Sequence, residues 1–162
     1  MNILVLNGPN LNMLGKREPE VYGNQSYSDL EKYLKSFEQR YDVTIDIKQS
    51  NLEGILIDLL QYADDRFDGV ILNAGAFTHY SYALYDAIKS ISIPVVEVHL
   101  SDLTKREEFR KISVIKDACI HSVMGLGFKS YEEGLKILLE GSEQKWLLKL
   151  KTTQIKFVSK NY

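Results

Sequence analysis

The sequence predicts an α/β protein in which a five-stranded parallel sheet lies between two layers of helices. Short apolar runs rich in β-branched residues are bounded by Gly, Asp or Asn, as is typical of parallel strands buried on both faces. Between these runs, apolar residues recur three and four positions apart, which indicates amphipathic helices. Because the two patterns alternate, right-handed crossovers are expected to connect the strands. The simplest such arrangement is a flavodoxin-like αβα sandwich with strand order 2-1-3-4-5.

The five strands are predicted by runs of two kinds. The first strand is the apolar run at residues 3–6, and the second, at residues 43–47, alternates apolar and polar residues. Such alternation suits an edge strand or a strand that is covered on one face only. The other three runs are nearly continuous and suit central strands; they lie at residues 70–72, 93–98 and 119–124.

Four helical patterns fill the intervals between and after these runs. The first begins at the capping box Ser28-Asp29-Leu30-Glu31, the second follows a candidate N-cap at Asn51, and the last follows a box that begins at Ser130. The apolar positions that predict the four helices are 30, 33, 34, 37 and 41, then 52, 55, 56, 59, 60 and 63, then 83, 84, 87 and 88, and finally 135, 138 and 139.

Composition restricts the class of partner. The 162 residues carry 20 Lys and Arg against 22 Asp and Glu, a net charge of −2, whereas general binders of nucleic acids or membrane surfaces need a cationic excess. The single Cys119 and three histidines are too few for a structural zinc cluster, so we expect no metal and a reducing compartment. The first apolar run stops at Asn7, too early for a signal segment or a membrane span, so we expect a cytoplasmic protein.

The charge distribution divides the chain at one point. Residues 142–162 carry five Lys against one Glu, a net charge of +4, whereas the preceding residues carry a net charge of −6. We therefore expect one domain at residues 1–141 and a basic C-terminal extension at residues 142–162. The stretch Trp146–Leu150 suits either an amphipathic contact with a membrane or partner or, more commonly, a terminal helix or strand packed on its own domain.

The candidate site lies where three predicted strands end, because open parallel sheets bind ligands outside the carboxyl ends of their strands. The residues that follow the first, third and fourth strands are Asn7–Leu11, Asn73–His79 and His99–Asp102. Taken alone, an asparagine at a strand end is usually a turn former and a single histidine is usually structural. The sequence leaves both explanations open, but three converging strand ends favour a site.

Two pairs of residues outside the strands suit catalysis or the binding of an anion. The interval Leu11–Tyr27 is long enough for a lid and contains Arg17 and Tyr22, although a solvated charged loop is the alternative. A tyrosine acts as a base at neutral pH if its pKa falls by about two to three units, which takes roughly 3–4 kcal/mol, and one arginine at about 4 Å supplies that much. Arg106 and Arg110, one helical turn apart, suit either anion binding or a salt-bridged surface helix.

Eight ordered blocks of the sequence match one known family. The blocks are Asn7-Gly8-Pro9-Asn10-Leu11, Leu14-Gly15-Lys16-Arg17-Glu18-Pro19, Val21-Tyr22-Gly23, Gln49-Ser50-Asn51 with Glu53-Gly54, Ile71-Leu72-Asn73-Ala74-Gly75, Thr78-His79, Glu97-Val98-His99-Leu100-Ser101 and Arg106-Glu107-Glu108-Phe109-Arg110. They closely resemble type II 3-dehydroquinate dehydratases and cover about residues 1–140. Eight blocks in the family's order are far more specific than a single glycine motif.

The resemblance implies a hydro-lyase without cofactors that converts 3-dehydroquinate to 3-dehydroshikimate and water, in the shikimate pathway of aromatic amino-acid biosynthesis. Tyr22 matches the ionised tyrosine that removes a proton next to the ketone and leaves an enolate, and Arg17 matches the arginine that activates it. Asn10 matches the residue that helps to hold a water against the enolate oxygen. His99 matches the general acid that protonates the departing hydroxyl.

The same resemblance implies the substrate contacts and the assembly. The Leu100-Ser101 backbone and the Ser101 hydroxyl match the groups that hold the substrate carboxylate. Asp86 matches a carboxylate that reaches into the site of an adjacent subunit, which implies trimers, usually four of them in a homododecamer. The residues that match the groups binding the ring hydroxyls are Asn73, His79 and Arg110.

Two features depart from the family pattern. Asp102 stands where the family usually has Asn, and it adds a negative charge beside the expected carboxylate pocket unless it points away or pairs with Lys105 or Arg106. The stretch Lys111–Ile115 is also less typical, so the packing of an oligomer is the expectation that these departures affect most.

A signalling or electron-transfer module on the same fold is the alternative from another class. A receiver needs an acidic pair after its first strand and a phosphate-accepting Asp after its third, where this chain has Asn7–Asn10 and Asn73–Gly75. A flavodoxin needs a hydroxyl-rich phosphate loop after its first strand, which the chain lacks. A lyase that acts on a related cyclic hydroxy-ketone would share every residue named above.

Overall fold

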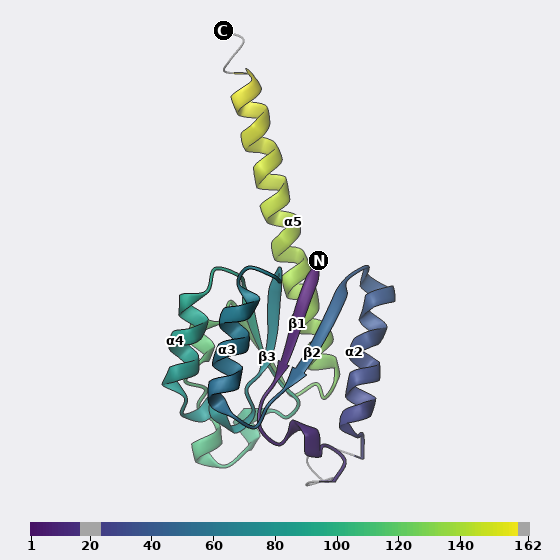
Figure 1. Cartoon of the computed structure of the whole chain (residues 1–162), viewed down its shortest axis with the longest axis vertical. Helices are drawn as coiled ribbons and strands as arrows, with labels where there is room; N and C mark the ends of the chain where they lie inside the picture. The colour runs from purple at the N-terminus through teal and green to yellow at the C-terminus, as the bar shows by residue number, and fades with distance from the viewer. Residues whose placement is uncertain (17–23, 159–162) are drawn as a thin grey trace.

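A computed structural model of the chain describes residues 1–16 and 24–158, with side chains described through residue 143. Within these residues the strands form one parallel sheet with the order β2-β1-β3-β4-β5. The predicted fold class and strand order are therefore confirmed (Figure 1). The strands are β1 (Asn2–Asn7), β2 (Thr44–Gln49), β3 (Gly69–Asn73), β4 (Val95–His99) and β5 (His121–Met124).

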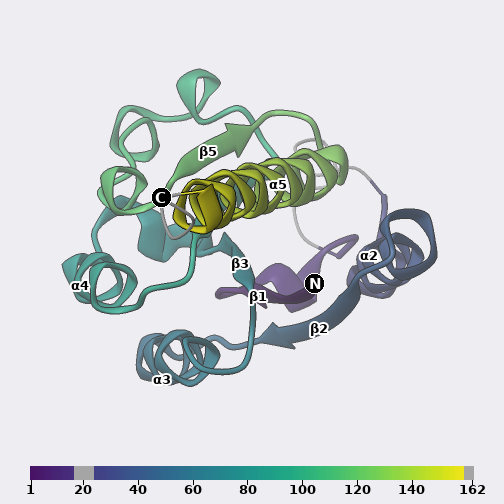
Figure 2. The ribbon, with the colours of Figure 1, turned by 90° about the horizontal axis from the view of Figure 1, so that it is seen from above.

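Four α-helices in the described part of the chain cover the two faces of the sheet. Seen from above, α2 and α5 lie on one face and α3 and α4 on the other (Figure 2). The helix bounds are Tyr27–Tyr41 for α2, Glu53–Ala63 for α3, Tyr82–Ser90 for α4 and Lys129–Val158 for α5.

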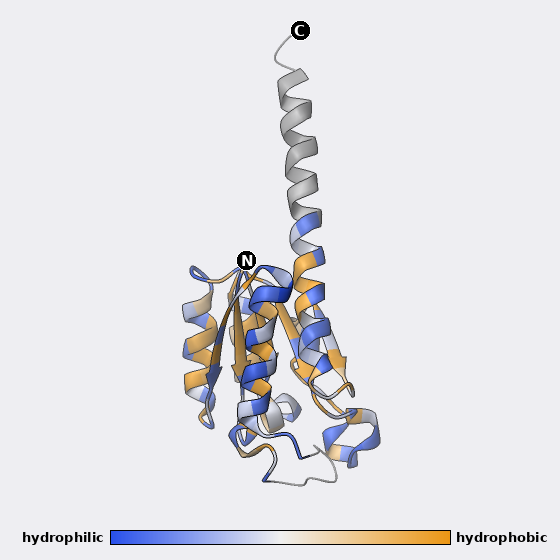
Figure 3. Cartoon of the chain, turned by 90° about the vertical axis from the view of Figure 1, so that its right-hand side faces the viewer, coloured by the Kyte–Doolittle hydropathy of each residue, from blue (hydrophilic) through white to orange (hydrophobic). Residues whose placement is uncertain are grey.

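The core consists of one apolar layer on each side of the sheet. Alternate residues of β1 point to opposite faces: Ile3 and Val5 pack with α2 and α5, whereas Leu4 and Leu6 pack with α3 and α4. All four side chains are fully buried, which explains why this strand is an unbroken apolar run. In Figure 3 the sheet and the inner helix faces are correspondingly hydrophobic.

The helix starts differ from the predicted ones at two points. The N-cap of α2 is Ser26 and not Ser28, because Ser26 and Asp29 form their own capping box and the earlier start places Tyr27 against the core. The N-cap of α3 is Leu52 and not Asn51. Asn51 instead accepts a hydrogen bond from the backbone of Asn10 at 2.9 Å, so its side chain serves the turn after β1.

Two strands begin two residues later than predicted. β4 begins at Val95, directly after Pro94, whose missing N–H cannot join the hydrogen-bond ladder. β5 begins at His121, since residues Lys116–Ala118 form a short 3₁₀ turn before it.

Helix α5 continues from the domain into the basic extension. Its 30 residues span about 45 Å, whereas the six residues of β1 span about 20 Å, so α5 runs past the end of the sheet (Figure 1). How the side chains of the extension pack lies outside the described residues. Within the described part of the chain, we find no helix with the length and apolar character needed to cross a membrane.

Two glycines bring the turns after β1 and β3 into backbone contact. A Cβ atom on Gly8 would lie 2.5 Å from the carbonyl oxygen of Ala74. Gly75 has a φ of 57°, and a Cβ atom there would lie 3.0 Å from the carbonyl oxygen of Pro9. The two turns therefore hold Asn10 and Asn73 at one edge of the sheet.

Candidate active site

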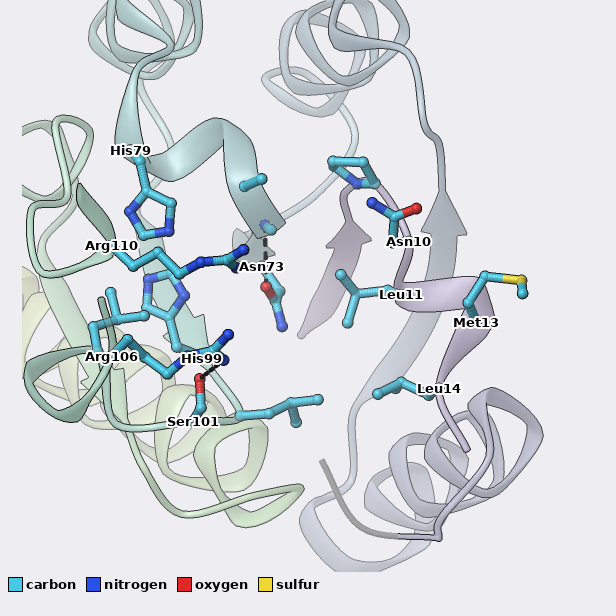
Figure 4. A pocket seen from close by; sticks show the side chains of 15 residues that line it. Asn10, Leu11, Met13, Leu14, Asn73, His79, His99, Ser101, Arg106 and Arg110 are labelled. Carbon is cyan, nitrogen blue, oxygen red and sulfur yellow. Dashed lines mark hydrogen bonds between the residues drawn. The ribbon is translucent and has the colours of Figure 1, made fainter. Parts of the chain in front are cut away.

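A pocket opens at the carboxyl ends of β1, β3 and β4 (Figure 4). Leu11, Met13 and Leu14 lie on one side of the pocket, across from the polar side chains His79, His99, Ser101, Arg106 and Arg110 (Figure 4). The structure thus confirms that the predicted strand ends converge. The predicted site residues that line the pocket are Asn10, Asn73, His79, His99, Leu100, Ser101 and Arg110.

Three predicted site residues remain, of which the structure describes only Asp86. Arg17 and Tyr22 lie outside the described residues. The preceding segment does reach the site, because Met13 and Leu14 form part of the pocket wall. Asp86 is exposed on α4, away from the pocket of its own chain.

Asn10 is held in an unusual backbone conformation at the pocket edge. Its φ of 65° lies in the left-handed region, which Asn tolerates better than most residues. The side chain of Asn51 accepts hydrogen bonds from the Asn10 backbone at 2.9 Å and from Gln49 Nε2 at 3.0 Å. Gln49 Nε2 also donates to the Gly8 carbonyl at 3.2 Å. The end of β2 therefore fixes the turn that carries Asn10.

His99, the last residue of β4, lies beside a buried carboxylate. Its Nε2 atom lies 2.9 Å from Oε1 of Glu97. The geometry is not that of a hydrogen bond, and Nε2 has no other hydrogen-bond partner among the described residues. The side chain of His99 is only 5 % exposed, and that of Glu97 is fully buried. This contact holds the His99 ring in place at the edge of the pocket.

Hydroxyl groups from three other segments surround Glu97. Thr78 and Ser113 donate to Oε1, the latter at 2.7 Å, and Ser122 of β5 donates to Oε2 at 2.7 Å. Burial opposes the charge, but the close His99 and the hydroxyl donors outweigh it and hold the pKa of Glu97 at about 2. Glu97 is therefore a fixed anion beneath the pocket.

Sequence reasoning assigned no role to Glu97, although a signal was present. Glu97 is the one acidic residue in an otherwise apolar strand run, and a charged side chain at such a position must be paired. Its hydroxyl partners come from distant parts of the chain and could not be read from spacing.

His79 presents one defined nitrogen to its surroundings. Its Nδ1 lies 2.8 Å from the carbonyl oxygen of Ile112, and because a carbonyl only accepts, Nδ1 carries the hydrogen. Partial burial is the main cause that holds the pKa of His79 below its ordinary value. The nearby His99 and Arg110 lower this pKa further, whereas the hydrogen bond with the Ile112 carbonyl raises it. A neutral His79 leaves Nε2 as a hydrogen-bond acceptor.

Arg106 and Arg110 both line the pocket, but they do not lie on the predicted surface helix. The segment forms two 3₁₀ turns, η3 (Leu103–Lys105) and η4 (Glu108–Arg110), with Arg106 between them. Both guanidinium groups lie 3.3 Å from the carboxylate of Glu107. Arg106 also donates to Ser101 Oγ at 3.5 Å (Figure 4). Arginine side chains in a pocket wall suit an anionic ligand.

Asp102 does not add its charge to the pocket. Its carboxylate caps η3 by accepting from the backbone and hydroxyl of Thr104, and it lies 3.3 Å from Lys105 Nζ. These partners hold the pKa of Asp102 below its ordinary value. The pairing with Lys105 considered from the sequence is confirmed.

Comparison with known proteins decides the family. The family model for class II dehydroquinases matches residues 1–139. The chain is 54% identical to a 3-dehydroquinate dehydratase of Bacillus pumilus over 138 residues, which cover 85% of this chain and 94% of the relative. The chain belongs to the class II dehydroquinase family. The expected hydro-lyase class is thereby confirmed, and the signalling or electron-transfer alternative is not favoured.

Two further relatives agree with this assignment. A 3-dehydroquinate dehydratase of Clostridium acetobutylicum is 50% identical over 138 residues, covering 85% of this chain and 96% of the relative. The crystal structure of a type II dehydroquinase from Butyrivibrio crossotus superposes with a TM-score of 0.84 at 44% identity, covering 85% of this chain and 97% of the other. The class II dehydroquinase fold therefore accounts for the arrangement of the pocket.

Proposed function

We propose that this chain dehydrates 3-dehydroquinate to 3-dehydroshikimate and water through an enolate. The observation that carries the proposal is the buried Glu97–His99 pair at the edge of a pocket that Arg106 and Arg110 line. Deprotonation next to a ketone followed by loss of a hydroxyl needs a base, an acid and a group that stabilises the enolate. In the described pocket, His99 is the candidate acid. The substrate of the family to which the chain belongs carries a carboxylate.

The proposed base is Tyr22, activated by Arg17. The sequence blocks that follow the family's order support this assignment, as does the position of Met13 and Leu14 in the pocket wall, a few residues before Arg17. In the proposed step, Tyr22 removes the proton next to the ketone. Asn10 helps to hold a water against the enolate oxygen, where a hydrogen bond strengthens as negative charge develops.

The proposed acid is His99, positioned by Glu97. After the enolate forms, His99 gives its proton to the departing hydroxyl, which leaves as water. The 2.9 Å contact between the two side chains supports this role, since the carboxylate orients the imidazole for proton transfer. Glu97 stays ionised throughout and acts as a positioning residue.

The substrate contacts follow the walls of the pocket. The carboxylate is proposed to bind the Leu100-Ser101 backbone and the Ser101 hydroxyl, close to the Arg106 guanidinium. The ring hydroxyls are proposed to bind Asn73, His79 and Arg110, all of which line the same pocket. A neutral His79 accepts a hydroxyl hydrogen at Nε2.

The proposal extends to the location and assembly of the protein. We propose a cytoplasmic enzyme of the shikimate pathway that acts without a cofactor. Asp86 is exposed on α4, as its proposed reach into an adjacent subunit of a trimer requires, and four trimers would form the dodecamer. We also propose that the catalytic domain ends near residue 141 and that residues 142–162 are an extension, since the family match ends at residue 139.

The direct test mixes the purified protein with 3-dehydroquinate and follows the ultraviolet absorbance of the conjugated enone product. We expect turnover by the wild type and none by Tyr22→Phe, because phenylalanine keeps the ring but has no oxygen to ionise. Circular dichroism and thermal melting check that the variant is folded. Near-normal turnover by Tyr22→Phe would show that Tyr22 is not the base. The absence of turnover by the wild type would contradict the proposed reaction itself.

A further inference from the structure

A chain of hydrogen bonds runs from the pocket into the core. The backbone N–H of Gly75 donates to Asn73 Oδ1 at 3.2 Å, and Asn73 Nδ2 donates to the Tyr131 hydroxyl at 2.9 Å. The Tyr131 hydroxyl then donates to Asn7 Oδ1 at 2.6 Å, and Asn7 Nδ2 donates to the Tyr27 hydroxyl at 3.4 Å. Of these side chains Asn73 lines the pocket, and Figure 4 shows its contact with Gly75.

The hydrogen bonds of this chain all point in one direction, and Gly75 sets that direction. A backbone N–H only donates, so it must face the oxygen of the Asn73 amide and not the nitrogen. The nitrogen therefore faces Tyr131, whose single hydroxyl hydrogen is left for Asn7. Burial raises the pKa of Tyr131 above its ordinary value, so that the phenol keeps this hydrogen.

We infer that Tyr131 is a positioning residue for the substrate site, because its hydroxyl fixes the orientation of the Asn73 amide. Tyr131 is fully buried on α5 and does not line the pocket, so it acts only through Asn73. With one N–H bound to Tyr131 and one lone pair bound to Gly75, Asn73 keeps one N–H and one lone pair for a ligand. This inference rests on the proposed function of Asn73.

The orientation matters because a buried amide without its partner has two competing arrangements. Asn73 is only 4 % exposed, so without the Tyr131 hydroxyl its Nδ2 loses a partner that water does not easily replace. The amide is then free to turn and to present its oxygen where the substrate needs the nitrogen. An enzyme that discriminates substrate hydroxyls by such contacts loses binding when one of them is misplaced.

The test is Tyr131→Phe, with Tyr33→Phe as the matched control. The Tyr33 hydroxyl also connects to another helix, through Glu132 of α5 at 2.5 Å, but it does not contact the pocket. We expect kcat/KM for 3-dehydroquinate to fall about tenfold in Tyr131→Phe, mainly through a higher KM, and to change less than about twofold in Tyr33→Phe. A merely structural role would lower thermal stability in both and leave KM unchanged.

A double mutant shows whether the effect passes through Asn73. In an Asn73→Ala background, we expect Tyr131→Phe to cause no further loss of kcat/KM beyond about twofold, because no amide remains to be oriented. The inference is overturned if Tyr131→Phe alone has near-normal KM, or if its loss is equally large in the Asn73→Ala background.

A measurement on the wild type covers the case in which Tyr131→Phe does not fold. In ¹⁵N-labelled protein, the Asn73 side-chain N–H groups should exchange slowly with solvent and show a contact with the Tyr131 hydroxyl. Rapid exchange without this contact would overturn the inference. If the wild type shows protected Asn73 N–H groups but no turnover of 3-dehydroquinate, the proposed function fails while the orientation by Tyr131 remains.

Discussion

Glu97 and Glu132 are two carboxylates with similar partners in different regions of the molecule. Glu97 lies on β4 beneath the pocket, with three hydroxyl donors and His99 around it. Glu132 lies on the side of α5 that faces α2, where it accepts from the hydroxyls of Tyr33 and Tyr41 and pairs with Arg40. Both have a pKa of about 2.

The cation and its neighbourhood separate the two sites. His99 lines the pocket, whereas Arg40 lies between α2 and α5 and stays charged at any pH that a protein meets. The Glu132 group therefore joins α2 to α5, whereas we propose that the Glu97 group serves proton transfer. The comparison teaches that hydroxyl donors keep a carboxylate ionised by lowering its pKa. Whether the carboxylate is structural or functional depends on the neighbouring basic group and on access to a pocket.

Glu97→Gln tests the catalytic side of this comparison and should have the largest effect. Glutamine keeps the size of the side chain but removes the negative charge beside His99. Because general acid catalysis contributes a factor of at least about 100, we expect kcat to fall about 100-fold, measured by the ultraviolet assay. Glu132→Gln is the matched control, since the same change is made away from the pocket. Equal activity of the two variants would contradict the separation.

Glu132→Gln should instead lower stability, by about 2 kcal/mol at neutral pH, measured by denaturant unfolding. Hydrogen bonds from Tyr33 and Tyr41, with the Arg40 charge, hold the pKa of Glu132 below its unfolded value despite some burial. A lowered folded pKa stabilises the protein above the unfolded pKa of about 4, and this contribution disappears as pH falls towards 2. The stability difference from the wild type should therefore shrink between about pH 5 and pH 2. A difference independent of pH would contradict the role of the charge.

Asp102 is a third carboxylate for this comparison, and the substitution Asp102→Asn should have the smallest effect. Asp102 also accepts from a hydroxyl and pairs with a cation, but its partners Thr104 and Lys105 lie outside the pocket, and its side chain is 30 % exposed. We expect KM for 3-dehydroquinate to change less than about twofold, as steady-state kinetics at two salt concentrations would show. A large salt-sensitive fall in KM would mean that the Asp102 charge does reach the substrate.

The sequence predicted the features that depend on local pattern. Strand order and the convergence of Asn73, His79 and His99 followed from apolar runs and from the rule for carboxyl strand ends. The cap of α2 was misplaced because Ser26 and Ser28 each precede an acid by three residues, and only packing of Tyr27 selects between them.

The contacts that could not be predicted join segments far apart in the sequence. Tyr131 was part of a predicted helix start, yet its hydroxyl reaches Asn7, 124 positions away. Ser122 is one of several polar residues near β5, and nothing in its spacing relates it to Glu97. Such pairs form only after the layers pack, so periodicity carries no information about them.

The backbone contact between the turns after β1 and β3 has a consequence for how the protein opens. Because Gly8 lies against Ala74 and Gly75 against Pro9, neither turn can detach from the sheet without the other. We therefore expect the motions that release a ligand to occur at the other borders of the pocket, while these two turns keep their positions relative to each other.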